Sequence, residues 1–319
     1  MADSRVNRTR LFRLVALSLV LAGPAAGAAP TADPEATVVQ ELVVTGRAGG
    51  PAWWRVSKGA STVYVLGVPE ALPRGLKWDM TLTRRRLAGA DELIEPPVVT
   101  ANLGDLFALL NARKRYRSKG PMENALPPDL RARFLAARPR LTSDARAYSG
   151  WTPLVAGLLM VSDFRRRAGL EVREPAGTVA RLARSQGLKV VPAGTFRAVT
   201  LIRAAEMGLA QSGPACLADA LDEIDAGAGQ IRAAAEGWAH GDVASALAAQ
   251  RGYEKCLNSL PEGADVAAKA MTGATTAIAA ALAVPGHSVA VVNLRTLLAE
   301  GGVLQRLQAR GYAVARPDQ

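Results

Sequence analysis

The sequence contains little of what most catalytic and metal-binding sites are built from. Only two histidines and two cysteines occur among 319 residues, so a zinc site of the usual Cys/His composition has too few ligands. The same scarcity argues against a Ser-His-Asp triad, and no Gly-x-Ser-x-Gly elbow is present. A phosphate-binding loop and a dinucleotide fingerprint are missing as well. The common hydrolase, kinase and dehydrogenase sites therefore find no support here.

Long hydrophobic runs are also lacking, except at the N-terminus. There, four arginines at positions 5, 8, 10 and 13 precede an apolar stretch and a group of small residues that ends at Ala28. The stretch has about ten residues, fewer than the roughly 20 that span a bilayer, so it predicts a cleaved secretory signal over residues 1–28. We expect a periplasmic or secreted protein with no stable membrane span after the signal is removed.

Basic residues exceed acidic ones, and the whole chain has a net charge of +11. The predicted signal carries four arginines and one aspartate, so the mature chain keeps a charge of +8. An exported basic protein meets few nucleic acids, so its charge is expected to face anionic lipid, lipopolysaccharide or acidic polysaccharide, or simply to keep it soluble. The partner is expected to be an envelope protein or an anionic polysaccharide. The basic clusters at 84–86, 113–119 and 165–167 have little aromatic interleaving, and we interpret them as solvated helix faces.

The two cysteines, Cys216 and Cys256, lie in separate helical stretches. An exported protein can oxidise them, and no histidine lies near enough in sequence to complete a metal site with them. We predict one disulfide that joins the two helices.

Composition divides the mature chain into an arm and a domain. Residues 29–51 are rich in proline, glycine and alanine and are predicted to form a flexible arm. The arm includes the segment VQELVVTGR at 39–47, which resembles a TonB-box-type segment, although an edge strand or a simple linker also fits. The remaining residues, 52–319, are predicted to form one domain.

Strand and helix patterns alternate within this domain. Two strand-like runs flank Lys58-Gly59, which predicts a hairpin. A helix–strand pattern with a stop at Gly187 follows at 176–195, and a strand–helix–strand pattern at 287–317. Helical spacing dominates about 103–170 and 198–282. The order predicts an α/β fold, with a central mixed sheet, flanking helices and an α-helical insertion. Eight residues are expected to be mostly buried: Trp53, Trp54, Val63, Val65, Leu66, Val289, Val291 and Leu304. Trp54 is the one for which alternation also allows half-exposure.

Two glutamates stand where predicted strands end. Glu70 follows the run STVYVLGVP, in which Gly67 is expected to let the backbone turn, and Glu95 ends the run ELIE. Such a pair could serve as acid and base, or nucleophile, of a glycosidase-like site. Equally, Glu70 could pair with a cation while Glu95 accepts backbone hydrogen bonds, and the sequence leaves both interpretations open.

Three pieces of sequence, in this order, are PAWWRVSKGASTVYVLGVPEALPRGLKW, AAAEGWAHGDVASAL and SVAVVNLRTLLAEGGVLQRLQARGYAV. Together they resemble the TraB/GumN family (TraB/PrgY/GumN, of the Tiki-like superfamily), over roughly Ala52 to Pro317. The resemblance implies an α/β fold of the ChaN/erythromycin-esterase type. It also implies a metal site built from two Gly-x-x-His motifs and nearby acids, and Tiki-type relatives are described as metal-dependent proteases.

This chain departs from the family pattern at its histidines. Glu70 stands at the first histidine position, three residues after Gly67, and Arg295 stands at the second, give or take one residue. A further family acid falls on Gly194, and the family Gly-Val-Asp falls on 174–176, whereas Glu95 keeps the glutamate of the second strand. The resemblance therefore implies family-motif positions Gly67, Glu70, Glu95 and Arg295 without a metal or other cofactor.

The two histidines that are present lie elsewhere: His240 on a helix, and His287 in a predicted turn. If the family backbone is kept, Glu70 and Arg295 should point toward each other, and we expect a salt bridge between them. Three functions remain open. The first is a catalytically degenerate binding or scaffold module, the second an atypical or metal-independent hydrolase that uses Glu70 and Glu95, and the third a partner of a TonB-linked system.

Overall fold

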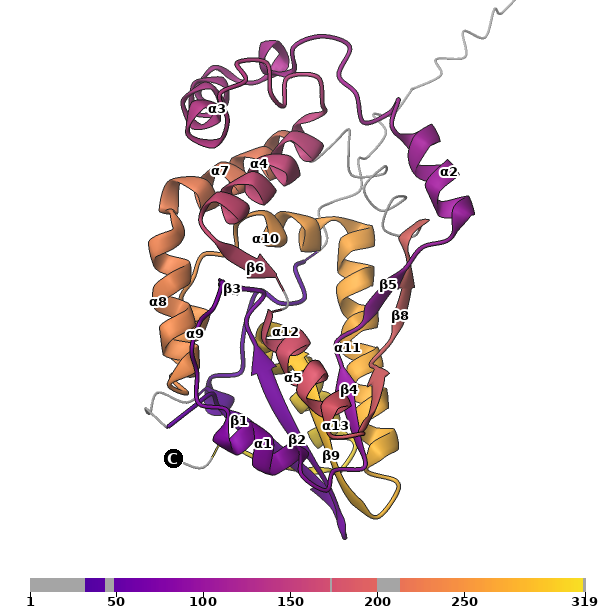
Figure 1. Ribbon diagram of the computed structural model, residues 1–319. Helices are drawn as coiled ribbons and strands as arrows, with labels where there is room; N and C mark the ends of the chain where they lie inside the picture. The colour runs from indigo at the N-terminus through magenta and orange to yellow at the C-terminus, as the bar shows by residue number, and fades with distance from the viewer. Residues whose placement is uncertain (1–31, 44–48, 173, 200–212, 318–319) are drawn as a thin grey trace, which may run out of the picture.

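A six-stranded mixed sheet lies at the centre of the protein (Figure 1). The computed structural model describes residues 32–43, 49–172, 174–199 and 213–317; the predicted signal peptide and residues 44–47 of the TonB-box-like segment lie outside these ranges. The strand order is β10-β1-β2-β9-β4-β7. The strands are β1 (Trp53–Lys58), β2 (Ser61–Val68), β4 (Glu92–Glu95), β7 (Lys189–Pro192), β9 (Gly286–Asn293) and β10 (Ala313–Ala315).

Antiparallel and parallel pairing divide the sheet into two halves. β1 and β2 form the predicted hairpin, in which Lys58 pairs with Ser61, and β10 adds to the outer side of β1. From β2 onward the sheet is parallel, through β9 and β4 to β7. The carboxyl ends of these four strands meet at one edge, which is where an open α/β sheet usually binds its ligand.

Helices cover both faces of the parallel half. In Figure 1, α1 (Thr81–Leu87) and α5 (Glu174–Ser185) lie in front of the sheet, and α11 (Pro261–Ala281), α12 (Leu294–Leu298) and α13 (Val303–Ala309) lie behind it. Residues 288–292 of β9 are all buried, because a central parallel strand packs apolar side chains on both faces.

The remaining helices stand above the carboxyl edge of the sheet in Figure 1, apart from α8 and α9, which lie at its side. They are α2 (Leu103–Ala112), α3 (Pro128–Leu141), α4 (Pro153–Arg167), α7 (Gly213–Ala226), α8 (Ala228–Ala239), α9 (Val243–Leu247) and α10 (Gly252–Ser259), with short 3-10 helices at Gln40–Leu42 and Met122–Ala125. Two small ladders join β3 (Ala71–Pro73) to β6 (Leu170–Val172) and β5 (Val98–Thr100) to β8 (Thr195–Arg197). Within the described residues, no helix has the length and apolar character needed to cross a membrane.

The predicted disulfide is confirmed. Cys216 on α7 and Cys256 on α10 are bonded, with their Cα atoms 5.1 Å apart. Both residues are buried beside Leu154, Val161 and Tyr253 in a small apolar cluster that joins α4, α7 and α10. The bridge therefore ties together the helices that stand over the carboxyl edge of the sheet.

The residues predicted to be buried form part of the main core. All eight are buried, with Val289 and Leu304 fully inaccessible. Half-exposure of Trp54 was wrong: its side chain is 0% exposed. The reason is that the face of β1 that carries Trp54 and the fully buried Val56 packs into the main core, and the indole Nε1 donates to the carbonyl of Leu42 at 3.3 Å.

Residues 32–43, within the segment predicted to be a flexible arm, pack against the domain. The backbone N–H of Val39 donates to the carbonyl of Leu298 at 2.8 Å, and Val38 forms a β-bridge with Ala299. Leu42 joins the main core, and Glu35 is 4% exposed. The described part of this segment therefore belongs to the folded domain.

Candidate functional site

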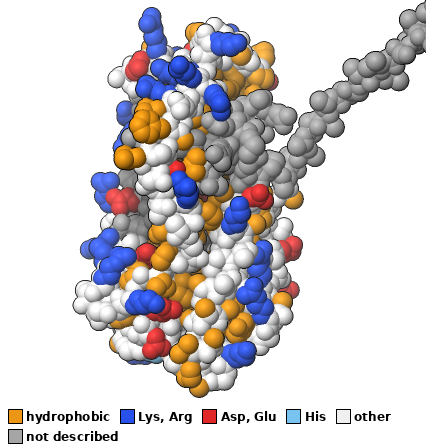
Figure 2. Space-filling view, turned by 90° about the vertical axis from the view of Figure 1, so that its right-hand side faces the viewer, with side chains coloured by type: hydrophobic (Ala, Val, Ile, Leu, Met, Phe, Trp, Pro, Cys, Tyr) orange, Lys and Arg blue, Asp and Glu red, His pale blue; other side chains and the backbone are white. Residues whose placement is uncertain are grey.

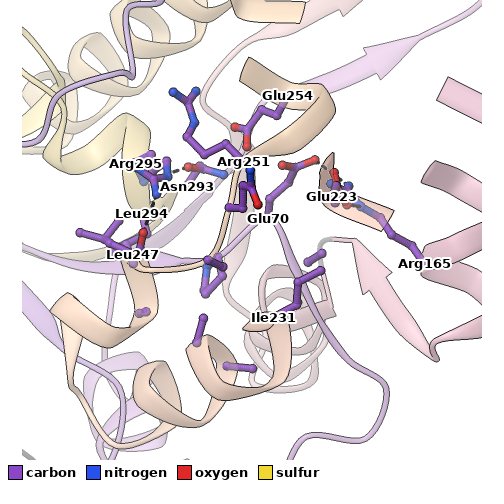
Figure 3. Close-up of a pocket in the computed structure, with 17 residues that line it drawn as sticks. Glu70, Arg165, Glu223, Ile231, Leu247, Arg251, Glu254, Asn293, Leu294 and Arg295 are labelled. Carbon is purple, nitrogen blue, oxygen red and sulfur yellow. Dashed lines mark hydrogen bonds and ion pairs between the residues drawn. The ribbon is translucent and has the colours of Figure 1, made fainter. Parts of the chain in front are cut away.

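Glu70 lies at the centre of the candidate site, between β2 and β3 (Figure 3). Its Oε1 accepts a hydrogen bond at 3.0 Å from Nη1 of Arg165, which stands in the last turn of α4. Burial alone would raise the pKa of Glu70, but the guanidinium of Arg165 and a hydrogen bond from Glu254 hold this pKa below its ordinary 4.5. Glu70 is therefore ionised at neutral pH.

A second carboxylate, Glu223 on α7, binds the same guanidinium. Nε of Arg165 donates to Glu223 at 2.7 Å, and the Glu223 side chain is only 2% exposed. The other oxygen of Glu223 accepts the backbone N–H of Tyr253 at 3.4 Å, in the first turn of α10, where the helix dipole favours a negative charge. Burial would lower the pKa of Arg165, but Glu70 and Glu223 together raise it, so the arginine stays charged.

A third carboxyl group, Glu254 in the first turn of α10, contacts Glu70 from the other side. Burial, the negative charge of Glu70 and the hydrogen bond to it raise the pKa of Glu254 well above 4.5. Two carboxylates this close repel each other, so one of them keeps its proton. Because the pKa of Glu254 is raised and that of Glu70 is lowered, the proton belongs to Glu254.

The N-terminal segment adds two more acids next to this pair. Asp33 and Glu35 both form ion pairs with Arg251, the residue before α10. Glu35 also accepts hydrogen bonds from Nδ2 of Asn258, at 3.1 Å, and from the hydroxyl of Thr296 on α12. Each of the two acid side chains is less than a tenth exposed. The segment thereby fixes α10 against α12 beside the site.

Arg295 does not form the predicted salt bridge with Glu70, whose cation is Arg165. Arg295 lines the same cavity, but its Nη2 donates to the carbonyl of Leu247 at 2.6 Å, as Figure 3 shows. Burial and the neighbouring Arg251 lower the pKa of Arg295. Glu70 and Arg295 line one cavity, but the ion pair expected between them was wrong.

Two cavities meet at Glu70. The smaller, of about 70 Å³, is charged, and Glu223, Arg251, Glu254 and Arg295 are among its lining residues. The larger, of about 360 Å³, lies at the carboxyl ends of β2, β4, β7 and β9 and is almost wholly apolar. Its lining side chains are Val68, Pro69, Pro96, Pro97, Val99, Ala176, Ala193, Phe196, Val266, Ala270, Ala274, Val291 and Val292, together with the polar Glu70, Asn293 and Thr296.

Gly67 shapes the site by letting two elements approach closely. It lies inside β2 and not at a turn, so the expected turning role was wrong. A Cβ on Gly67 would lie 2.5 Å from Cδ1 of Leu294 on α12, which explains the glycine. Its carbonyl accepts a hydrogen bond from the indole Nε1 of Trp238 on α8 at 2.7 Å. Residues from all three of the quoted sequence pieces therefore meet at Gly67.

Glu95 stands apart from Glu70. It ends β4 as predicted, but its side chain forms an ion pair with Arg184 of α5 at 3.4 Å, and its carbonyl accepts the backbone N–H of Ala193. Pro96 and Pro97, which follow it, line the apolar cavity, whereas Glu95 does not. No contact of the described residues joins the two glutamates.

The side chains around Glu70 do not fit a divalent metal. His240 is the exposed C-cap of α8, and His287 lies in β9, near its start, where its ring contacts Tyr64; the turn expected for His287 was wrong. Neither histidine lines either cavity. Among the described residues no group of three His, Cys, Asp or Glu side chains is placed to hold an ion. The cations that surround Glu70 would also repel one.

Sequence reasoning did not identify Arg165, Glu223 or Glu254. The sequence did contain a signal for Arg165 and Glu223, because both lie at helical spacing from buried residues. Glu223 follows Cys216 by seven residues on the buried face of α7, and Arg165 follows Val161 by four on α4. A charged residue in an apolar stripe is expected to have a buried partner. Nothing in the local pattern of α10 singles out Glu254.

Comparison with known proteins gives one match. The model of the TraB/PrgY/gumN family matches residues 52–316. Searches among curated proteins and among solved structures found no match.

Proposed function

The chain belongs to the TraB/PrgY/gumN family, and we propose that it is an exported, catalytically degenerate member that binds a small apolar ligand or an apolar segment of an envelope protein. One observation carries the proposal. The resemblance implies a metal-binding histidine at each of two strand ends. At the first, Glu70 forms an ion pair with Arg165. At the second, Thr296, the residue after Arg295, donates a hydrogen bond to Glu35. Every charged group there already has a partner from the chain itself.

The apolar cavity beside Glu70 supports the binding role. A volume of about 360 Å³ falls in the range of small-molecule sites, which are mostly apolar with a few polar groups that orient the ligand. Here the oxygens of Glu70 and Thr296 would provide acceptors for a ligand that donates hydrogen bonds from one end. This lining does not suit an anionic polysaccharide, so of the two partners expected from the sequence we favour an envelope protein, and we add an apolar small molecule because of the cavity.

A fluorescent apolar amine, N-phenyl-1-naphthylamine, tests this role. We expect its fluorescence to rise on binding to the protein and the rise to be lost in Ala270→Phe, which fills the cavity from α11. Ala280→Phe is the matched control, because Ala280 is exposed on the same helix and does not line the cavity. Equal binding by both variants, or no binding by the unmodified protein, would rule the cavity out as the ligand site.

An atypical hydrolase, for which the sequence suggested Glu70 and Glu95, is the second candidate; Glu254 is the better partner for Glu70, because Glu95 lines neither cavity. The observation in its favour is the proton held on Glu254 beside Glu70, since a neutral carboxylic acid next to a carboxylate can act as a general acid. A screen of peptide and glycoside substrates separates the two functions. Turnover that disappears in Glu95→Gln and in Glu70→Gln would favour the hydrolase, and so would zinc or manganese bound in stoichiometric amount.

Export is part of the proposal and has its own test. We expect the protein recovered from the periplasm or medium to begin at Ala29, after cleavage following Ala28. Intact-mass measurement of that protein gives the answer, and a retained residue 1 would overturn the prediction.

A further inference from the structure

Helix α2 presents an apolar face to solvent. Leu103, Phe107 and Leu110 follow one another at the four- and three-residue spacing of a single helix face. These residues are 77%, 64% and 52% exposed. Single exposed apolar residues need no explanation, but three large ones on one stripe form a surface that water solvates poorly. We call these three residues the α2 face.

The opposite side of α2 faces the protein. Asp105, 3% exposed, completes a capping box with Asn102 and forms an ion pair with Arg197 of β8 at 3.1 Å. Ala112, seven residues after Asp105 and on the same side, is 2% exposed. The helix is therefore fixed through a polar and small-residue side, which leaves Leu103, Phe107 and Leu110 outward.

A basic segment follows directly. Residues 113–119 include five exposed cations, Arg113, Lys114, Arg115, Arg117 and Lys119, and no acidic residue occurs in the sequence between Leu106 and Met122. The guanidinium of Arg117 lies 4.5 Å from the ring centroid of Trp151, and a backbone bridge between these two residues fixes the segment. Figure 2 looks at the side that carries α2, and in its upper half hydrophobic side chains lie beside lysines and arginines.

We propose that the α2 face and residues 113–119 form a docking surface for an anionic phospholipid bilayer. Leu and Phe side chains on one helix face enter the boundary between headgroups and acyl chains, and adjacent cations are attracted to the anionic headgroups. A second copy of the chain fits less well, because symmetric pairing of this face would bring two basic segments together. The sequence alone had suggested that residues 113–119 are only a solvated helix face.

Vesicle flotation with the exported, processed protein tests the surface. We expect binding to vesicles of phosphatidylcholine mixed with phosphatidylglycerol, and little binding to phosphatidylcholine alone. Phe107→Ser combined with Leu110→Ser should weaken binding about tenfold or more. Arg113→Gln combined with Lys114→Gln should weaken it about fivefold for each charge, and should reduce its dependence on salt.

Matched controls lie at the other end of the molecule. Val284, 65% exposed, is changed to Ser as the apolar control, and exposed Arg84 and Arg85 of α1 are changed to Gln as the charge control. Circular dichroism and thermal melting check that every variant folds. Binding that is lost in the α2 variants and kept in the controls supports the proposal.

Three results would overturn it. The first is no binding to the anionic vesicles, and the second is binding that the α2 variants leave unchanged. The third is self-association in sedimentation, without vesicles, that Phe107→Ser abolishes; this would make the α2 face an interface between copies of the chain.

Discussion

Arg165 on α4 lies 2.7 Å from the carboxylate of Glu223 on α7, a side chain that is almost fully buried. The same guanidinium reaches Glu70 at the end of β2, so a single arginine connects two helices of the upper layer to the edge of the sheet. An ion pair of this kind adds little net stability, but its geometry fixes which groups face the cavity. The charge state of the candidate site therefore depends on where two helices pack.

Removal of Arg165 should destabilise the protein strongly. Arg165→Met leaves the buried Glu223 without its cation, and we expect a loss of about 3–5 kcal/mol in the free energy of unfolding. The matched control is Arg166→Met, since Arg166 is 71% exposed and pairs with Asp163 on the surface. It should change stability by less than about 1 kcal/mol. Urea denaturation measures the free energy of unfolding of both variants. Equal losses would contradict the assignment of Arg165 as the cation that pairs with the buried Glu223.

The proton shared between Glu254 and Glu70 predicts a pH dependence of stability. Because the folded state raises the pKa of Glu254 above 4.5, the unfolded chain loses this proton first as pH rises. Stability should fall above pH 4.5, toward the raised pKa, by at most about 1.4 kcal/mol per pH unit. Glu70, whose pKa is lowered, contributes stability that is lost only below 4.5. The two effects therefore occupy different pH ranges.

Glu254→Gln provides the measurement. The amide imitates the protonated acid, so the variant should be more stable than the unmodified protein near pH 8 and similar to it near pH 5. Exposed Glu41→Gln is the control and should leave the pH profile unchanged. Urea unfolding across this range decides the question; a profile that Glu254→Gln does not alter would place the proton elsewhere.

Loss of the disulfide should lower stability without preventing assembly of the sheet. Cys216 and Cys256 are 40 residues apart. A disulfide that closes a loop of that size stabilises the folded state by about 3–4 kcal/mol. Cys216→Ser combined with Cys256→Ser should therefore show a lower melting temperature, measured by calorimetry. A reducing agent should lower the melting temperature of the unmodified protein to that of the variant and leave the variant unaffected. If the reductant has no effect on either, the bond does not form in the protein.

The N-terminal segment should contribute to stability through Glu35. Its carboxylate joins Arg251, Asn258 and Thr296, and Glu35→Ala leaves these donors without their acceptor, at a cost of about 2–3 kcal/mol. Glu41→Ala, an exposed acid of the same segment, serves as the control and should cost less than about 0.5 kcal/mol. Thermal melting that shows equal, small effects would mean that the segment is not held by Glu35 in solution.

Alternation and helix stops in the sequence were sufficient to predict the α/β fold and much of its core. The runs that became β2 and β9 are apolar and β-branched because both faces of a central parallel strand are covered, and that composition is visible locally. The Cys216–Cys256 bridge was predictable because only one pairing of two cysteines exists. The position of Glu70 just after a strand followed from the end of the apolar run at Pro69, although Gly67 itself lies inside the strand.

Only the tertiary structure decided which charges meet. Glu70 and Arg165 are separated by 95 positions, and no local period encodes the angle at which α4 crosses the strand end. Trp54 is buried because its face of β1 packs into the main core and its indole N–H donates to Leu42 of the N-terminal segment, neither of which alternation alone reports. Sequence periodicity reports which face of an element is apolar. The partner of each face, and of each buried charge, depends on long-range packing, because that packing alone brings distant elements within contact distance.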